Sequence, residues 1–164
     1  DVWILDPVDG TTNLIHDFRN STLSLALARK GVLTLGIIYH PYSDEIFVAE
    51  RGKGALLNGS PISVSKRQNF SECLISIGTS PYYRKLAKEN FRIFEKVFTD
   101  CADIRRLGSA ALELAYVAAA GMLLVEEAGG KVTDYKGNPV DITGNSDIVA
   151  GNRAIGEILV EKYL

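Results

Sequence analysis

Two aspartates near the start of the chain have the spacing of a metal-binding loop. Asp6 and Asp9 lie three residues apart in the segment WILDPVDGTTN, which spans residues 3–13 and begins with an apolar run. Mg²⁺ prefers carboxylate and carbonyl oxygens and completes its coordination with water and substrate phosphate. We therefore expect the two carboxylates to bind a hard divalent cation, with the carbonyl oxygen of Val8 available as a third ligand.

The residues that follow have the features of a phosphate-binding turn. Gly10 lacks a Cβ and lets a ligand approach the backbone closely. A helix that begins here would direct the free N–H groups of Gly10, Thr11 and Thr12 towards an anion. The hydroxyl of Thr11 could also orient an attacking water. Together with a bound metal, this arrangement predicts hydrolysis of a phosphate ester.

The same loop also has a simpler structural interpretation. Asp9 or Thr11 could cap a helix, and Asp6 could simply end a strand, which is the commoner outcome for an isolated D-x-x-D pattern. The complete string, in which Pro7 and Gly10 stand among the acids and threonines, favours the metal and phosphate site.

The elements that position this loop are expected to form an antiparallel sheet followed by alternating strands and helices. Period-2 runs and turn signals predict a buried strand at 2–5, a turn into a helix at 9–12, strands at 21–28, 33–39, 45–50 and 55–57, and hairpin turns at 51–54 and 58–59. Beyond them we expect strands at 73–77, 103–106, 131–133 and 148–150 and helices at 82–97, 109–128 and 154–163, with Ser109 as the cap of the long helix. This order predicts an α/β catalytic unit of two lobes, residues 1–70 and 71–164.

The composition excludes several classes of function. A chain of 164 residues that is 46% hydrophobic and 23% charged suits a globular fold, and its net charge of −2 provides no basic field for nucleic acid or an anionic membrane. The longest nearly uncharged run, residues 114–125, is shorter than the roughly 20 residues of a membrane span. The two cysteines are far apart and no basic leader is visible, so we expect a cytoplasmic protein with reduced thiols and no nucleic-acid or membrane partner.

The loop at residues 3–13 resembles the signature of the inositol monophosphatase family, whose members are magnesium-dependent, lithium-sensitive sugar phosphatases. Further segments resemble that family in the same order: ERGKGALLNGSPISVS (50–65), RRLGSAALELAYVAA (105–119), AAGMLLVEEAGGKVTD (119–134) and IVAGN (148–152). The resemblance implies a layered αβαβα sugar-phosphatase fold, a homodimer, and hydrolysis of myo-inositol monophosphate. Family relatives with other substrates stay open as alternatives, namely fructose-1,6-bisphosphatase, NADP(H) phosphatase and 3′(2′),5′-bisphosphate nucleotidase.

The resemblance also implies a role for each residue of the loop. Asp6, Val8 and Asp9 would bind metal, in a complete site of two or three Mg²⁺ ions. Gly10 and Thr11 would hold the phosphate, and Thr11 together with Asp9 would act in catalysis, with Thr11 helping to activate the water.

Two later segments match substrate-pocket positions of the family. Gly108, Ser109 and Ala110 match positions that line the sugar pocket. Thr79 and Ser80 fall near another pocket segment, although a polar loop that caps the following helix explains them equally well.

The chain departs from the family pattern in two places. A family glutamate that binds metal and pairs with the threonine belongs to a segment that would precede residue 1, and a family Trp-Asp pair is missing at residues 118–120, where one predicted helix runs directly into the next. We expect these segments to belong to a longer protein that extends towards the N-terminus. A real deletion would instead leave a non-catalytic, dimerising scaffold. With these residues alone, we expect a metal site that has too few ligands.

Overall fold

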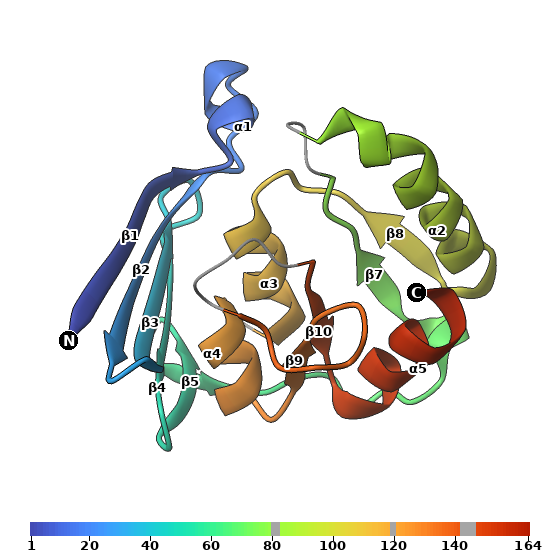
Figure 1. The fold of residues 1–164 in the computed structure, drawn as a ribbon. Helices are drawn as coiled ribbons and strands as arrows, with labels where there is room; N and C mark the ends of the chain where they lie inside the picture. Colours follow the sequence, from blue (N-terminus) through green and yellow to red (C-terminus); the bar gives the residue numbers. More distant parts are fainter. Residues whose placement is uncertain (80–82, 119–120, 142–146) are drawn as a thin grey trace.

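The computed structural model describes residues 1–79, 83–118, 121–141 and 147–164 (Figure 1). Ser80, one of the two expected residues of the second pocket segment, lies outside the described residues, as does the junction at 119–120. Within the described part, a six-stranded sheet is followed by helices and two two-stranded sheets. The mixed α/β architecture that the sequence predicts is therefore confirmed.

The first half of the chain forms an antiparallel sheet whose strands follow one another in chain order. Its members are β1 (Val2–Asp9), β2 (Thr22–Arg29), β3 (Val32–His40), β4 (Glu45–Glu50), β5 (Gly54–Leu57) and β6 (Ser60–Ile62). The predicted hairpin at Asn58-Gly59 is confirmed, with φ angles of 48° and 79°. Both angles are positive, as the tight turn between two paired strands requires. Strand β6, for which the sequence patterns gave no range, is the second strand of this hairpin.

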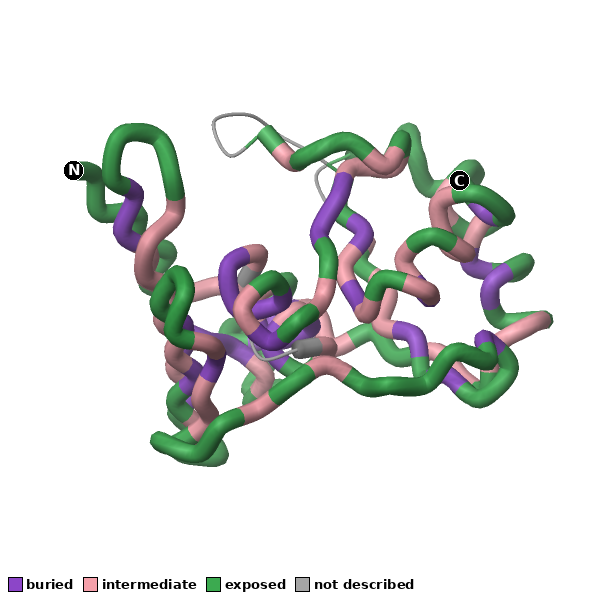
Figure 2. Tube along the Cα trace, turned by 90° about the horizontal axis from the view of Figure 1, so that it is seen from below, coloured by how far each residue is buried: buried purple, intermediate pink, exposed green. Residues whose placement is uncertain are grey.

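Strand β1 is an exposed edge strand rather than the buried strand that its apolar residues predict. Trp3 is 58% exposed and Leu5 is 57% exposed, and among the described residues β1 pairs with β2 alone. Figure 2 shows this N-terminal segment as a run of exposed positions. An apolar run indicates a strand, but it does not determine which elements cover that strand.

Two helices lie against one face of the large sheet. The predicted single helix at 109–128 is in fact α3 (Ala110–Ala118) and α4 (Gly121–Glu127). Residues 119–120, between the two helices, lie outside the described residues. The main core lies between these helices and the sheet, and it includes Ile38, Phe47, Ala49, Leu112, Leu124 and Val125.

The rest of the chain contributes to the main core through Val132 of β9 and forms a second, smaller core that includes Phe70, Ile75, Val97 and Ile155. Its elements are η1 (Phe70–Glu72), β7 (Leu74–Ser76), η2 (Arg84–Leu86), α2 (Ala87–Asp100), β8 (Asp103–Arg105), β9 (Lys131–Thr133), β10 (Val149–Gly151) and α5 (Arg153–Tyr163). Strand β7 pairs with β8 in parallel, and β10 pairs with β9 in antiparallel fashion. The rings of Phe70 and Tyr163 stack with centroids 5.1 Å apart and join η1 to α5.

None of the helices described is long and apolar enough to cross a membrane. The division of the chain into lobes at residue 70 stays a prediction.

Candidate active site

The end of β1, which leads through Gly10 into the short helix α1 (Thr11–Ile15), holds the two aspartates. The predicted helix start is confirmed, and Leu14 N–H donates to the Gly10 carbonyl at 3.1 Å. The cap, however, is Gly10 with a φ of 83°, and no side chain caps this helix. The alternative in which Asp9 or Thr11 caps α1 is therefore wrong.

The carboxylate of Asp9 instead caps α3, about a hundred residues further along the chain. Its Oδ2 accepts a hydrogen bond from the Ser109 hydroxyl and another from Ala111 N–H at 2.8 Å. The same Ser109 hydroxyl accepts from Leu112 N–H at 3.1 Å, so the predicted Ser109 cap is confirmed. Since Ser109 is 1% exposed and contacts the Thr22 hydroxyl at 3.2 Å, its side chain is part of a buried joint between the two halves.

Most of the expected site residues line one cleft of about 580 Å³. The expected residues among its lining are Asp6, Val8, Asp9, Gly10, Thr11, Thr79, Gly108 and Ala110. The structure thus brings the aspartate loop and the turn before α3 together, as the sequence interpretation requires. Ser109 is the exception, because its side chain points to Asp9 and is not among the residues that line the cleft.

Further polar side chains line the same cleft. Arg106 supplies a positive charge there, and Tyr135 and Asp147 also line the cleft. Arg106 lines the cleft, whereas Arg105 forms an ion pair with the neighbouring side chain of Asp103.

Glu113 is a buried carboxylate that the sequence reasoning missed. It is 8% exposed, and its Oε1 accepts hydrogen bonds from Leu107 N–H at 2.7 Å and Gly108 N–H at 2.9 Å. Burial raises the pKa of the Glu113 carboxyl, while these two hydrogen bonds and the charge of Arg106 act in the opposite direction. Glu113 therefore holds the turn that carries the pocket residue Gly108. Its position four residues after the Ser109 cap was the only available signal.

Asn13 is a second buried residue that the sequence reasoning did not single out. Its Nδ2 donates to the carbonyls of Asn20 and Leu107, both at 2.7 Å. The first bond closes the connection between β1 and β2, and the second fastens that connection to the turn that precedes α3. Because Leu107 is 94 positions away in sequence, no local pattern around Asn13 predicts this contact.

The loop offers oxygen ligands of the type that Mg²⁺ prefers. Asp6 is exposed, and its Oδ1 accepts a hydrogen bond from Val8 N–H at 3.1 Å. The Val8 carbonyl accepts from the Thr11 hydroxyl at 3.0 Å. The two carboxylates and this carbonyl are donors of the chemical type that a hard cation takes together with water. In the described ranges there is no group of three or more His, Cys, Asp or Glu side chains that could hold a metal, so this loop does not provide the ligands of a site with two or three ions.

Comparison with known proteins shows the family to which the chain belongs. The sequence profile of the Inositol monophosphatase family matches residues 1–119. The chain belongs to the inositol monophosphatase family. The inositol-1-monophosphatase of Mesorhizobium japonicum is 38% identical over 177 aligned positions, which cover 97% of this chain and 66% of that protein. The Nus factor SuhB of Escherichia coli is 40% identical over 92% of this chain and 62% of its own length.

Solved structures of the family confirm the expected α/β sugar-phosphatase fold. One of them is SaIMPase-II, an inositol monophosphatase of Staphylococcus aureus, with inositol monophosphate bound. It is 30% identical with a TM-score of 0.87, over 99% of this chain and 70% of that one. The same protein with 2′AMP bound has a TM-score of 0.88.

The chain spans about two thirds of the length of these relatives, and part of the difference lies inside the aligned region. The alignment with the Mesorhizobium protein has 177 positions but covers 97% of a 164-residue chain. Roughly 18 of its positions therefore have no counterpart here. The family profile match ends at residue 119, at the junction of α3 and α4.

Replacing Gly10 with alanine tests the close contact between the loop and the α3 turn. An added Cβ would lie 2.8 Å from the Asn20 carbonyl oxygen and 3.1 Å from the Ser109 Cβ, at a positive φ. We expect Gly10→Ala to lower the free energy of unfolding by about 1–3 kcal/mol in urea denaturation. Gly31→Ala is the matched control, because it has a similar φ of 78° but open space around its Cβ. Equal losses of unfolding free energy in Gly10→Ala and Gly31→Ala would contradict the close contact between Gly10 and the α3 turn.

The pKa of Glu113 predicts a pH-dependent difference in stability. Because burial raises this pKa in the folded state, the unfolded chain releases the proton at lower pH. Stability therefore falls as the pH rises from the ordinary pKa of 4.5 through the raised value. Glu113→Gln keeps a hydrogen-bond acceptor and removes the titration. We expect this variant to gain stability relative to the original chain as the pH rises through that window, measured by urea unfolding. If the difference in unfolding free energy between Glu113→Gln and the original chain stays constant with pH, the raised pKa of Glu113 is contradicted.

Proposed function

We propose that the intact protein is a Mg²⁺-dependent phosphatase that hydrolyses phosphate monoesters, with myo-inositol monophosphate as its substrate. The observation that supports this proposal is the cleft in which the Asp6–Thr11 loop meets Gly108 and Ala110. Residues from both halves of the chain line that cleft. Their types suit the two parts of the substrate, the phosphate with its metal and the alcohol. The loop suits a metal and a phosphate, and the turn suits the alcohol part of the ester.

Each loop residue has a distinct task in the proposed reaction. The carboxylates of Asp6 and Asp9 and the carbonyl of Val8 would hold the metal. When bound, Mg²⁺ supplies positive charge for the phosphoryl oxygens and makes the attacking water more acidic. The Thr11 hydroxyl, which lies 3.0 Å from the Val8 carbonyl, would orient that water.

The phosphate would lie against the start of α1. The N–H groups in the first turn of a helix have no acceptor within the helix and attract anions. Gly10 and Thr11 line the cleft at this point. Arg106, which lines the same cleft, would add a positive charge for the same group. A monoester bound in this way directs its alcohol towards Gly108 and Ala110.

The name of the Mesorhizobium relative and the inositol monophosphate in SaIMPase-II support inositol monophosphate as the substrate. The 2′AMP in SaIMPase-II keeps nucleotide phosphatases of the family as alternatives, together with fructose-1,6-bisphosphatase and NADP(H) phosphatase. A cytoplasmic location and a homodimer belong to the same proposal.

A non-catalytic role is the alternative of a different class. It is favoured by the small number of acidic ligands that the described residues bring together. The name Nus factor, which the Escherichia coli relative carries, is consistent with a second role of this kind.

Phosphate release by the intact protein tests the proposal. We expect Mg²⁺-dependent release from inositol 1-phosphate that exceeds release from fructose 1,6-bisphosphate, NADP and adenosine 3′,5′-bisphosphate. Asp6→Asn should lower kcat/KM by about 100-fold or more, because it removes a ligand charge. Asp17→Asn is the control, since Asp17 is an exposed aspartate that pairs with Arg19 and does not line the cleft. Release that is independent of Mg²⁺, or equal in the two variants, would contradict the proposal.

A further inference from the structure

A chain of hydrogen bonds at the end of the β3–β4 hairpin has His40 at its centre. This histidine is the last residue of β3 and is only 5% exposed. Its ring Nε2 lies 3.1 Å from the carbonyl oxygen of Arg19, in the connection between α1 and β2. Its ring Nδ1 lies 2.6 Å from the hydroxyl oxygen of Ser43. The proposed reaction assigns no task to this buried ring.

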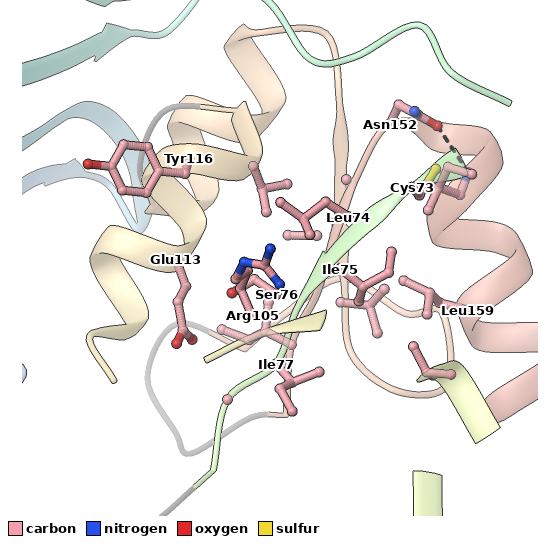
Figure 3. A pocket seen from close by; sticks show the side chains of 18 of the residues that line it. Cys73, Leu74, Ile75, Ser76, Ile77, Arg105, Glu113, Tyr116, Asn152 and Leu159 are labelled. Carbon is pink, nitrogen blue, oxygen red and sulfur yellow. Dashed lines mark hydrogen bonds between the residues drawn. The ribbon is translucent and has the colours of Figure 1, made fainter. Parts of the chain in front are cut away.

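The chain of hydrogen bonds continues from Ser43 to helix α3. The Ser43 hydroxyl donates to Glu45 Oε2 at 2.6 Å, and the Tyr116 hydroxyl donates to the same oxygen at 3.0 Å. Figure 3 shows that the Tyr116 ring of α3 points away from Ser76 of β7. The ring meets that of Phe47 in β4 edge to face, with centroids 6.1 Å apart. The hairpin thus joins the α1–β2 connection to α3.

The hydrogens available to these groups indicate a proton on each ring nitrogen of His40. A carbonyl oxygen only accepts, so Nε2 must carry a hydrogen to bind Arg19. The hydrogen bond from Ser43 holds the pKa of the Glu45 carboxyl below its ordinary value, against the effect of partial burial, so this carboxylate also only accepts. It takes the single hydrogen of the Ser43 hydroxyl, whose oxygen can then only accept from Nδ1. All contacts of the chain form together only when the ring is an imidazolium.

The charges around the ring favour the same state. Glu45 Oε2 lies 3.7 Å from Nδ1 and supplies the negative charge that a buried cation requires. The Tyr42 ring lies beside that of His40, with centroids 5.7 Å apart. The titratable neighbours other than Glu45 have partners of their own: Arg19 pairs with Asp17, Tyr39 donates to Asp44, and the Tyr42 hydroxyl contacts that of Ser21.

The segment that His40 holds has a backbone conformation that needs support. Asp17 and Arg19 have positive φ angles of 50° and 32°, which non-glycine residues seldom adopt. Such residues persist where neighbouring contacts hold them in place. Phe18 N–H donates to the Asn13 carbonyl at 2.8 Å, and His40 supplies the bond at Arg19.

This segment forms the wall behind the start of α1. The carbonyl oxygen of Asn20 lies 2.8 Å from the position that a Cβ on Gly10 would take. Gly10 and Thr11 line the cleft immediately in front of it. A shift of residues 17–20 would therefore displace the turn that is proposed to hold the phosphate.

We propose that His40 is a positioning residue for the phosphate site and that its doubly protonated ring holds this site in place. When Nδ1 loses its proton, the Ser43 hydrogen has to leave either the ring or Glu45. The bond to Arg19 then becomes a neutral one, which is about half as strong. Because histidine ordinarily changes charge between about pH 5 and 8, phosphate binding weakens as the pH rises through that range. The effect on phosphate rests on the proposed function, whereas the hold on residues 17–20 does not.

A pH series on the intact protein tests the hold on residues 17–20 without any measurement of activity. The ring signals of His40 are assigned in a nitrogen NMR spectrum by their absence from His40→Gln and are followed from about pH 5 to 9. Protection of the Phe18 N–H against hydrogen exchange is measured over the same range. We expect this protection to fall with the same midpoint at which the His40 ring loses its proton.

Kinetics of phosphate release test the effect on the site. Glutamine at position 40 keeps a neutral N–H donor for Arg19 and does not titrate. We expect the KM for inositol 1-phosphate to be about 5-fold higher in His40→Gln than in the original protein at about pH 6, and the two values to converge by about pH 8.5. His40→Phe has no donor and should have the higher KM at every pH. If His40→Phe fails the check of folding by circular dichroism, the comparison with His40→Gln decides.

Two adjacent acids provide a variant and its matched control. Glu45→Gln removes the charge that faces the ring, so the His40 ring should lose its proton at a lower pH than in the original protein. Asp44→Asn should leave that midpoint unchanged, because Asp44 accepts from the Tyr39 hydroxyl at 3.0 Å. Its φ of 55° is one that asparagine tolerates.

Three results would overturn the proposal. The first is protection of the Phe18 N–H that does not follow the titration of the His40 ring. The second is a KM ratio between His40→Gln and the original protein that is the same at every pH. The third is an equal change of midpoint in Glu45→Gln and Asp44→Asn. A protein that releases no phosphate, yet shows the linked transition of His40 and Phe18, would contradict the proposed function while supporting the hold of His40 on residues 17–20.

Discussion

The carboxylate of Asp9 is the interaction on which the candidate site depends. One of its oxygens accepts hydrogen bonds from the Ser109 hydroxyl and the Ala111 N–H, so that a side chain at the end of β1 caps α3. A negative charge is favourable at the start of a helix, where the N–H groups are unpaired. Because this oxygen is engaged, the other carboxylate oxygen is the one available to a metal. The aspartate loop and the pocket turn can therefore form a single cleft only when the two halves of the chain are docked.

Hydrogen bonds of Asn13 and Glu113 hold the same connection between the aspartate loop and the turn before α3. Asn13 binds the carbonyl of Leu107, while Glu113 binds the N–H groups of Leu107 and Gly108. All of these groups lie within or beside the turn that precedes α3. Buried hydrogen bonds of this kind favour one arrangement over others, since breaking any of them leaves a polar group without a partner. The geometry of the cleft is thus determined by polar contacts, whereas the apolar cores lie to either side of it.

Local patterns predicted much of the fold. Strands β2 to β5, the Asn58-Gly59 hairpin and the Ser109 cap have signals within a few residues of themselves, and all are present. The exposure of β1 could not be predicted, because it depends on which distant segments lie alongside. The same reason explains why the aspartate loop was identified but Asn13 and Glu113 were not. Their significance comes from partners and from burial, which their own sequence neighbourhoods do not reveal.

A double-mutant cycle between Asp9 and Ser109 tests the central claim most directly. The free energy of unfolding is measured in urea, without metal, for the original chain, Asp9→Ala, Ser109→Ala and the double variant. If the two side chains join the halves of the chain, their coupling energy is about 0.5–3 kcal/mol. If the losses of unfolding free energy in the two single variants sum to the loss in the double variant within about 0.3 kcal/mol, the two residues act independently. That result would contradict the account of a site assembled through the Asp9 carboxylate.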